Sequence, residues 1–371
     1  MRKYIKVFKE ITIKDIPEVG GKNASLGEMY NKLTSQGIKV PDGFATTSYA
    51  FWTFLEENNL TNKLKELLGN LDRNTYYNLN NIGAQARELI LKGKFSEKLL
   101  VQIKKAYKEL SGKSNIDVAV RSSATAEDLP DASCAGQHET FLNIKGEDAL
   151  LDAVKKCFAS LYTNRAIKYR EEKGFKHSEV ALSVGVQKMV RSDKGCSGVG
   201  FTIDPESGFE NVMLFSGVWG LGENIVQGTV NPDDFYVFKP TLKQGYFPLI
   251  QKKIGDKDKI MIYNKSNGHD SIINIDTPKE KQEAFVLNDD EVIKLSQWAL
   301  LIETHYKKPM DIEWAKDGIT NQLFIIQARP ETVHKSKYKT RFYDDEQTVI
   351  GKIITKGNHI GTKKSVGSEI I

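Results

Sequence analysis

Two stretches near the end of the chain, "PMDIEWAK" at 309–316 and "FIIQARPETV" at 324–333, predict a β-hairpin. Both alternate apolar and polar residues, which is the pattern of strands that bury one face. The apolar faces match across the hairpin, with Met310, Ile312 and Trp314 on the first strand and Phe324, Ile326 and Ala328 on the second. We therefore expect one face of this hairpin to pack on a hydrophobic core.

The other face of the hairpin is polar. A register symmetric about Thr320 sets Glu313 opposite Gln327 and Asp311 opposite Arg329, with the Cβ atoms of each pair about 4.5–5.5 Å apart. Three of these four side chains carry the oxygen ligands that Mg²⁺ prefers. The alternative is an ordinary solvated strand face with one cross-strand ion pair.

Length and composition indicate a globular protein of two or three domains. The chain has 371 residues, of which 40% are hydrophobic and 27% charged, as in soluble folded proteins. The net charge of +5 is spread along the chain, whereas a nucleic-acid-binding surface needs clustered basic residues. We expect no nucleic-acid partner.

No apolar segment of the sequence is long enough to predict a membrane span. The longest runs, such as "VMLFSGVW" at 212–219, are far shorter than a bilayer span. The first residues, "MRKYIKVFKEITIKD", are interrupted by charges and do not resemble a signal peptide. The three cysteines, Cys134, Cys157 and Cys196, lack metal-ligand spacing. A reducing, cytoplasmic setting is the expectation.

The hydrophobic period changes along the chain, which predicts an α+β (mixed α/β) fold. Helical spacing is seen in 22–36, 48–68, 76–92 and 95–110, and again in 147–172 and 289–306. Strand patterns occupy 116–120, 139–144, 180–190, 197–203 and 211–218, with weaker signals in 240–276. After Arg329-Pro330 the sequence becomes polar and glycine-spaced. That change predicts a linker followed by the start of another element.

The stretch "VAVRSSATAEDLPDASCAGQHETF" at 118–141 is a candidate anion site. Its strand delivers Arg121 into small hydroxylated residues, Ser122 and Ser123, which we expect to begin a loop. A guanidinium fits phosphate oxygens, and small residues let backbone N–H groups approach an anion. The alternative is a surface loop rich in turn formers.

A second candidate is "VGGKNASLGEM" at 19–29, where two glycines precede Lys22 and a helix start with Asn23 or Ser25 as its cap. A lysine at a helix N-terminus suits an anion, because the free N–H groups and the helix dipole already favour negative charge there. The spacing is not that of a P-loop. On its own, a capped helix after a turn is the simpler interpretation.

The glycine-rich stretch "WGLGENIVQGTVNPDDF" at 219–235 does not match a dinucleotide-binding loop, so a Rossmann fold is rejected. Glu223 remains a candidate for binding a ribose hydroxyl or a metal-bound water. None of the six histidines stands beside a nucleophile pattern, and none is a catalytic candidate.

Taken in order, these motifs resemble one family. The stretches "VGGKNASLGEM", "VPDGFATT", "AVRSSATAEDLPDASCAGQHETFLN", "SGVGFTIDPESGF", "WGLGENIVQGTVNPDDFYV", "KPMDIEWAKDG" and "LFIIQARPETV" are similar to the N-terminal nucleotide-binding domain of phosphoenolpyruvate synthases (pyruvate, water dikinases). The resemblance runs from about residue 8 to 334. It favours this family over pyruvate, phosphate dikinase and rifampin phosphotransferase.

The resemblance implies an ATP-grasp-like fold of two to three subdomains across 1–334, with ATP between two lobes and the Arg-Ser-Ser segment in a lid. By position, Lys22, Arg121 and Arg329 would bind the polyphosphate with Ser122 and Ser123, and Asp311 would support them. Glu313 and Gln327 would hold Mg²⁺. The segment 187–190, with Gln187, Met189 and Val190, resembles the hinge whose backbone meets the adenine. Glu223 would help to bind the nucleotide.

The family reaction converts ATP, pyruvate and water to AMP, phosphoenolpyruvate and phosphate through a histidine on a following domain, and pyruvate binds in a further domain. Residues 335–371 would be the linker and the start of that histidine domain. We therefore expect an incomplete piece that holds no catalytic residue of its own: it binds Mg-ATP but cannot make phosphoenolpyruvate. Cys134 departs from an apolar residue usual in the lid. A dikinase with another acceptor and a non-catalytic nucleotide-binding module remain alternatives.

Overall fold

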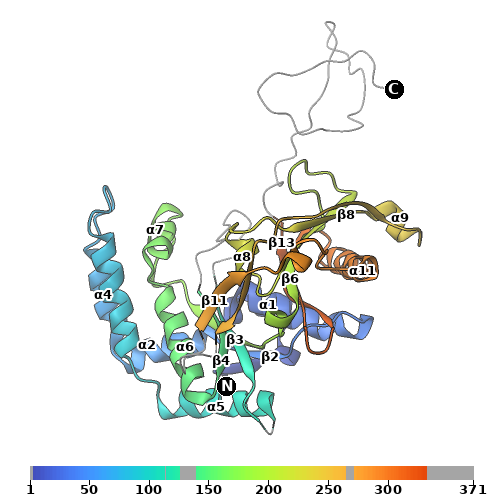
Figure 1. Ribbon diagram of the computed structural model, residues 1–371. Helices are drawn as coiled ribbons and strands as arrows, with labels where there is room; N and C mark the ends of the chain where they lie inside the picture. The colour runs from blue at the N-terminus through green and yellow to red at the C-terminus, as the bar shows by residue number, and fades with distance from the viewer. Residues whose placement is uncertain (1–2, 113, 126–138, 265–270, 332–371) are drawn as a thin grey trace, which may run out of the picture.

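The computed structural model describes residues 3–112, 114–125, 139–264 and 271–331. Predictions for the lid residues 126–138, including Cys134, and for the linker at 335–371 lie outside these ranges. Helices and antiparallel sheets alternate along the chain (Figure 1), so the α+β class is confirmed.

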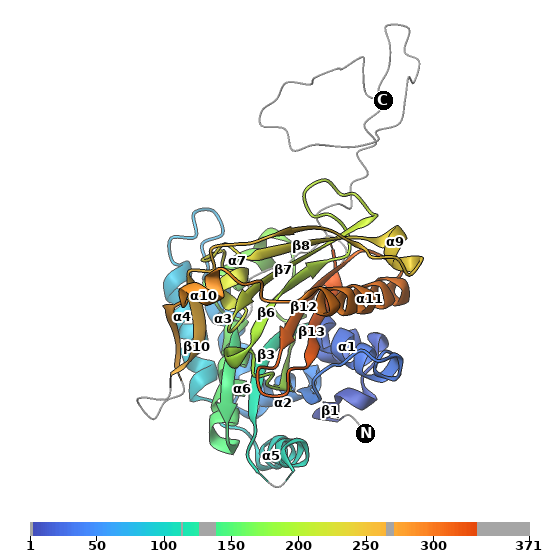
Figure 2. The same cartoon turned by 45° about the vertical axis from the view of Figure 1, so that its right-hand side comes forward.

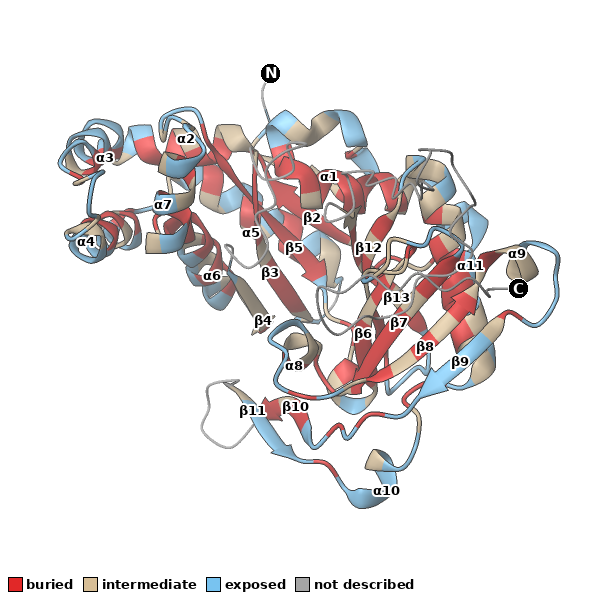
Figure 3. Cartoon of the chain, turned by 90° about the horizontal axis from the view of Figure 1, so that it is seen from above, coloured by how far each residue is buried: buried red, intermediate tan, exposed pale blue. Residues whose placement is uncertain are grey.

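A five-stranded antiparallel sheet has the order β1-β2-β5-β3-β4. Its strands are β1 (Ile5–Val7), β2 (Gly43–Thr46), β3 (Asp117–Ala124), β4 (Thr140–Lys145) and β5 (Leu182–Lys188). Apolar side chains such as Val118 and Val120 of β3 and Val184 and Val186 of β5 are buried on it. This sheet forms the floor of one lobe (Figure 3).

Most helices of the first half of the chain belong to this lobe. They are α2 (Ser48–Glu57), α3 (Leu60–Gly69), α4 (Leu79–Lys92), α5 (Glu97–Ser111), α6 (Glu147–Ser160) and α7 (Asn164–Glu172). Their apolar faces share one core with the sheet, in which Phe51, Phe54 and Phe158 pack with ring centroids 5.2–5.5 Å apart. The helical spacing read from the sequence is confirmed throughout this region.

A six-stranded antiparallel sheet forms the second lobe, in the order β13-β12-β6-β7-β8-β9 (Figure 2). Its strands are β6 (Cys196–Phe201), β7 (Val212–Trp219), β8 (Asp233–Phe238), β9 (Leu249–Lys253), β12 (Met310–Lys316) and β13 (Leu323–Pro330). The long helix α11 (Asp289–Tyr306) packs on it and begins with a capping box between Asn288 and Glu291.

Smaller elements complete the second lobe. They are α8 (Glu223–Val226), α9 (Lys239–Lys243), α10 (Lys279–Gln282) and the hairpin β10 (Lys259–Asn264) and β11 (Ser271–Asp276). Short 3₁₀ turns span Phe8–Glu10, Ile13–Asp15, Thr34–Gln36 and Ser192–Lys194. Across the described ranges, no helix combines the length and the apolar character that a membrane crossing requires.

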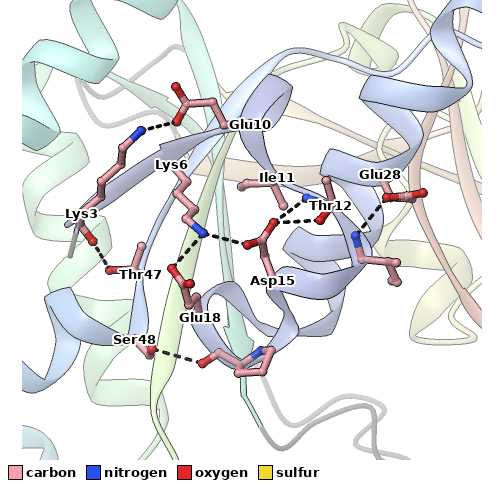
Figure 4. Close-up of polar contacts among 12 residues, drawn as sticks. Lys3, Lys6, Glu10, Ile11, Thr12, Asp15, Glu18, Glu28, Thr47 and Ser48 are labelled. Carbon is pink, nitrogen blue, oxygen red and sulfur yellow. Dashed lines mark hydrogen bonds and ion pairs between the residues drawn. The ribbon is translucent and has the colours of Figure 1, made fainter. Parts of the chain in front are cut away.

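Helix α1 (Ile16–Lys32) lies between the lobes, against β3 and β5 of one sheet and β13 of the other. Its first turn is tied to the N-terminal strand by Lys6, whose Nζ lies 2.8 Å from a carboxylate oxygen of Asp15 and 2.8 Å from one of Glu18 (Figure 4). At Gly20 the backbone has φ 73° and ψ 165°, which kinks the helix and starts a second segment after it. Glycine alone reaches this region without strain.

Gly20→Ala is expected to destabilise the fold by more than the roughly 1–3 kcal/mol of backbone strain. An added Cβ would overlap Oγ of Ser123 and lie 2.7 Å from the Ser123 carbonyl oxygen. Gly37→Ala is the matched control, since Gly37 has φ 91° but open space around its Cβ position, and about 1 kcal/mol is expected there. Urea unfolding of both variants measures the difference. Equal losses of unfolding free energy in the two variants would show that the contact with Ser123 does not contribute to the effect.

Candidate functional site

The final hairpin has the predicted register in its polar part. Glu313 pairs with Gln327, and Asp311 pairs with Arg329. Arg329 donates from Nε and Nη2 to the same oxygen of Asp311, at 2.7 and 2.6 Å. Two oxygen-bearing side chains and a carboxylate–guanidinium pair therefore stand side by side on adjacent strands.

The apolar face differs from the prediction. A β-bulge between Glu313 and Trp314 sets Trp314 opposite Ile325 and leaves Ile326 without a partner on β12. Leu323, Ile325 and Ala328 enter the core, whereas the predicted Phe324 and Ile326 are only half-buried. The extra residue reverses the alternation of the strand on one side of the bulge.

Arg121 joins the two sheets at this hairpin. From β3 it donates from Nη2 to Oε2 of Glu313 at 2.7 Å, and from Nη1 to the carbonyl oxygen of Ile326 at 3.2 Å. Ile326 lies at the bulge of β13, which among the described strands pairs with β12 alone. Arg121 of one sheet therefore contacts Glu313 of the other.

The two carboxyl groups of β12 are held in different electrostatic settings. Burial acts to raise the pKa of Glu313, but the charge and hydrogen bond of Arg121, with the charges of Lys22 and Arg329, outweigh it and lower the pKa. Burial raises the pKa of Asp311 above its usual value, although Arg329 opposes this. Glu313 is thereby kept as a carboxylate, the form that binds a cation.

Lys22 lies just after the Gly20 kink, at the start of the second segment of α1, as predicted. The prediction that Asn23 or Ser25 caps this helix is wrong, because both side chains make tertiary contacts instead. Asn23 donates to Oγ of Ser183 at 2.9 Å and to its own helix, and Ser25 donates to the carbonyl oxygen of Ala328 at 2.7 Å.

Ser122 and Ser123 belong to β3 rather than to a loop, which corrects the predicted boundary. They pair with Val184 and Ser183 of β5, and both side chains are buried. Ser122 donates to the carbonyl oxygen of Glu139 at 3.3 Å. The strand continues because β5 supplies a complete ladder of backbone hydrogen-bond partners for it.

The segment 187–190 runs out of β5 toward the second lobe. Gln187 is buried and donates from Nε2 to the carbonyl oxygen of Pro41 at 3.4 Å. The Met189 N–H donates to the carbonyl oxygen of Asp117 at 3.0 Å, and Val190 is buried. The Met189 side chain packs beside an apolar cluster of Leu221, Met261 and Tyr263.

Arg191 follows this segment directly and was not singled out from the sequence. Its guanidinium lies over the ring of Tyr263, 5.6 Å from the centroid, and its Nε donates to Asp193 at 2.7 Å. The stack ties the segment to β10. The sequence feature that could have identified Arg191 is its position directly after the end of an apolar strand.

Glu223 begins α8 and is half-buried. Burial raises the pKa of its carboxyl group, and the nearby charge of Arg121 opposes the rise. Glu223 is therefore close enough to Arg121 to feel its charge, although 102 residues separate them in the sequence. Hydrogen bonds and strand pairing thus bring Arg121, Glu313 and Arg329 together, and helix α1, which carries Lys22, packs against β13.

The paired Glu313 carboxylate and Gln327 amide are the residues that fit a magnesium ion. Mg²⁺ is commonly held by one or two protein oxygens and completes its shell with phosphate oxygens and water. The described part of the chain holds no cluster of three or more His, Cys, Asp or Glu side chains suited to a metal.

Comparison with known proteins places the chain in a family. Residues 16–349 match the family described as pyruvate phosphate dikinase, AMP/ATP-binding domain. Among similar proteins are the phosphoenolpyruvate synthases of Aquifex aeolicus (50% identity, 96% of this chain, 43% of the relative), Helicobacter pylori (49%, 98% and 47%) and Escherichia coli K12 (48%, 97% and 46%).

The chain thus spans less than half the length of these relatives. The N-terminal phosphoenolpyruvate synthase resemblance is confirmed at the level of sequence. Because the family match covers most of the chain, the chain belongs to the family of pyruvate phosphate dikinase AMP/ATP-binding domains.

Proposed function

We propose that this chain binds Mg-ATP between its two sheets and presents the phosphates for transfer. The observation that carries the proposal is the contact of Arg121, on one sheet, with the Glu313–Gln327 hairpin of the other. Lys22 and Arg329 bring two further cations to the same place. Phosphoryl transfer depends mainly on positioning and charge neutralisation, which these side chains supply.

In this proposal Glu313 and Gln327 would hold Mg²⁺, which would supply neutralisation of the phosphate charge. Lys22, Arg121 and Arg329 contact the polyphosphate, with Asp311 orienting Arg329. The guanidinium of Arg121, which donates to Glu313 in the structure, lies where it can also contact phosphate. Ser122 and Ser123, buried in β3, act by shaping the strand that carries Arg121.

The base and ribose have candidate places as well. The segment 187–190, with Gln187, Met189 and Val190, lies beside the apolar cluster of Leu221 and Met261, which suits a planar base. Glu223 is near Arg121 and is proposed to accept a ribose hydroxyl or a metal-bound water. The nucleotide would then run from Met189 to the final hairpin.

For the longer protein, we propose the reaction that the family resemblance implies, in which ATP, pyruvate and water give phosphoenolpyruvate, AMP and phosphate in the cytoplasm; the relatives are named phosphoenolpyruvate synthases. The phosphoryl group would pass to a histidine on a following domain, and pyruvate would bind in a further one. The nucleotide-binding domain is proposed as 1–334 and the linker as 335–371. A related dikinase with another acceptor, or a non-catalytic nucleotide-binding module, is the alternative.

Calorimetric titration of the folded chain with ATP, in the presence of Mg²⁺ and then of EDTA, tests the binding proposal. Saturable binding that weakens at least tenfold without Mg²⁺ is expected. Absence of ATP binding by folded protein would overturn the proposal. Transfer of the label from ³²P-ATP to a separately supplied histidine domain distinguishes a dikinase part from a binding module.

A further inference from the structure

Ser25 lies on the helix that carries Lys22 but belongs to none of the nucleotide contacts proposed above. Its side chain is 6% exposed, and its hydroxyl donates to the carbonyl oxygen of Ala328 at 2.7 Å across 303 residues of sequence. Residues three apart on a helix project to the same side. Ser25 therefore attaches to β13 the same face of α1 that carries Lys22.

The residue that accepts the hydrogen bond from Ser25 lies between two candidate site residues of β13. Ala328 stands between Gln327 and Arg329, the candidate metal ligand and phosphate-binding cation. Because β13 pairs with β12 on one side only, the carbonyl groups along its other edge can accept bonds from other elements. Ala328 uses this edge to accept from α1, and Ile326 uses it to accept from Arg121.

Contacts at the free edge of β13 thus fix the positions of Arg121 and Lys22 relative to the side chains of β13 itself. Ile326 binds the guanidinium of Arg121 directly, whereas Ala328 reaches Lys22 through Ser25, one helical turn away. Helix α1, which carries Lys22, packs directly against β13.

We propose that Ser25 is a positioning residue, which sets Lys22 in register with Gln327 and Arg329 through its bond to Ala328. This rests on the proposed function, since Lys22 is positioned for the polyphosphate. A fixed ammonium binds phosphate without first losing conformational freedom. Loss of the hydroxyl should therefore weaken ATP binding, and it should do so through Lys22.

Ser25→Ala is expected to weaken Mg-ATP binding about fivefold to tenfold, the effect of one buried hydrogen bond. Affinity for AMP should change by less than twofold, because AMP lacks the phosphates that Lys22 is proposed to reach. In a Lys22→Met background the same substitution should have no further effect on ATP affinity. Calorimetric titration of the four proteins with ATP and with AMP gives these values.

The matched control is Ser296→Ala. Ser296 is fully buried in α11, and its hydroxyl donates to the carbonyl oxygen of Val292 in its own helix at 2.7 Å. This variant loses a comparable buried hydroxyl and should keep wild-type ATP affinity. A reduction in ATP affinity equal to that of Ser25→Ala would show a general loss of stability and overturn the proposal.

Three other outcomes also overturn the positioning role: unchanged ATP affinity in Ser25→Ala, equal weakening of ATP and AMP, or an undiminished effect in the Lys22→Met background. Failure of the proposed function is distinguishable from all of these. In that case the wild-type chain itself binds no Mg-ATP, and no variant comparison is needed to see it.

Discussion

Arg329→Ala is expected to weaken Mg-ATP binding by about a hundredfold, the largest effect on affinity among these predictions. A charge-assisted hydrogen bond is worth about 1.5–3 kcal/mol, and about 2.7 kcal/mol corresponds to that factor. Arg329 would lose its phosphate contacts, and Asp311 would lose its guanidinium partner at 2.6 Å. Because burial already raises the pKa of Asp311, that carboxyl group should titrate higher still.

Two further variants sharpen the measurement by isothermal titration calorimetry. Arg329→Lys keeps the charge but not the planar fork, so an intermediate affinity is expected. Arg73→Ala is the control, because Arg73 makes a comparable pair with Glu171, at 2.8 Å, in the helical lobe. A loss in Arg73→Ala as large as that in Arg329→Ala would contradict a local role for Arg329.

Lys257→Met is expected to lower the free energy of unfolding by about 3–5 kcal/mol, the usual result of breaking a buried ion pair. Lys257 and Asp233 are both fully buried and form an ion pair. The Lys257 ammonium also donates to the carbonyl oxygens of Gly255 and Gln282, at 2.9 and 3.1 Å. Methionine fills similar space but leaves the Asp233 carboxylate without its cation.

Urea unfolding compares this variant with Lys259→Met. Lys259 pairs with Asp276 across the β10–β11 hairpin, where both side chains are exposed, and such surface pairs contribute about 0–1 kcal/mol. Removing both partners of the buried pair should not restore stability, because Asp233 also accepts from the N–H groups of Gly255 and Val286, at 2.9 and 2.8 Å. Similar losses of unfolding free energy for Lys257→Met and Lys259→Met would show that burial does not strengthen the contribution of the Lys257–Asp233 pair to stability.

The polar register of the last hairpin could be predicted because strict alternation leaves little freedom from Asp311 to Glu313. The bulge could not, because Ile325 and Ile326 are chemically identical and either satisfies the apolar pattern. The bulge accompanies a contact with another sheet, because Arg121 of β3 donates to the Ile326 carbonyl group. Only tertiary structure contains that information.

Other differences have similar causes. Ser122 and Ser123 have the composition of a turn, but pairing with β5 extends the strand through them. The strand β8 was missed because it begins with Asp233 and Asp234 after a proline, which are turn signals. Asp233 is buried beside Lys257, 24 residues away, and the N–H groups of Gly255 and Val286 also donate to it. Local propensity cannot predict a partner of that kind.

The bond between Ser25 and Ala328 also bears on the order of synthesis and folding. At about 5–20 residues per second, a ribosome needs on the order of tens of seconds to proceed from α1 to β13. Throughout that interval the face of α1 destined for β13 has no partner strand. The helical lobe, whose core draws on residues 44–186, can form first. We therefore expect the site to assemble late in folding, because contacts so distant in sequence form slowly.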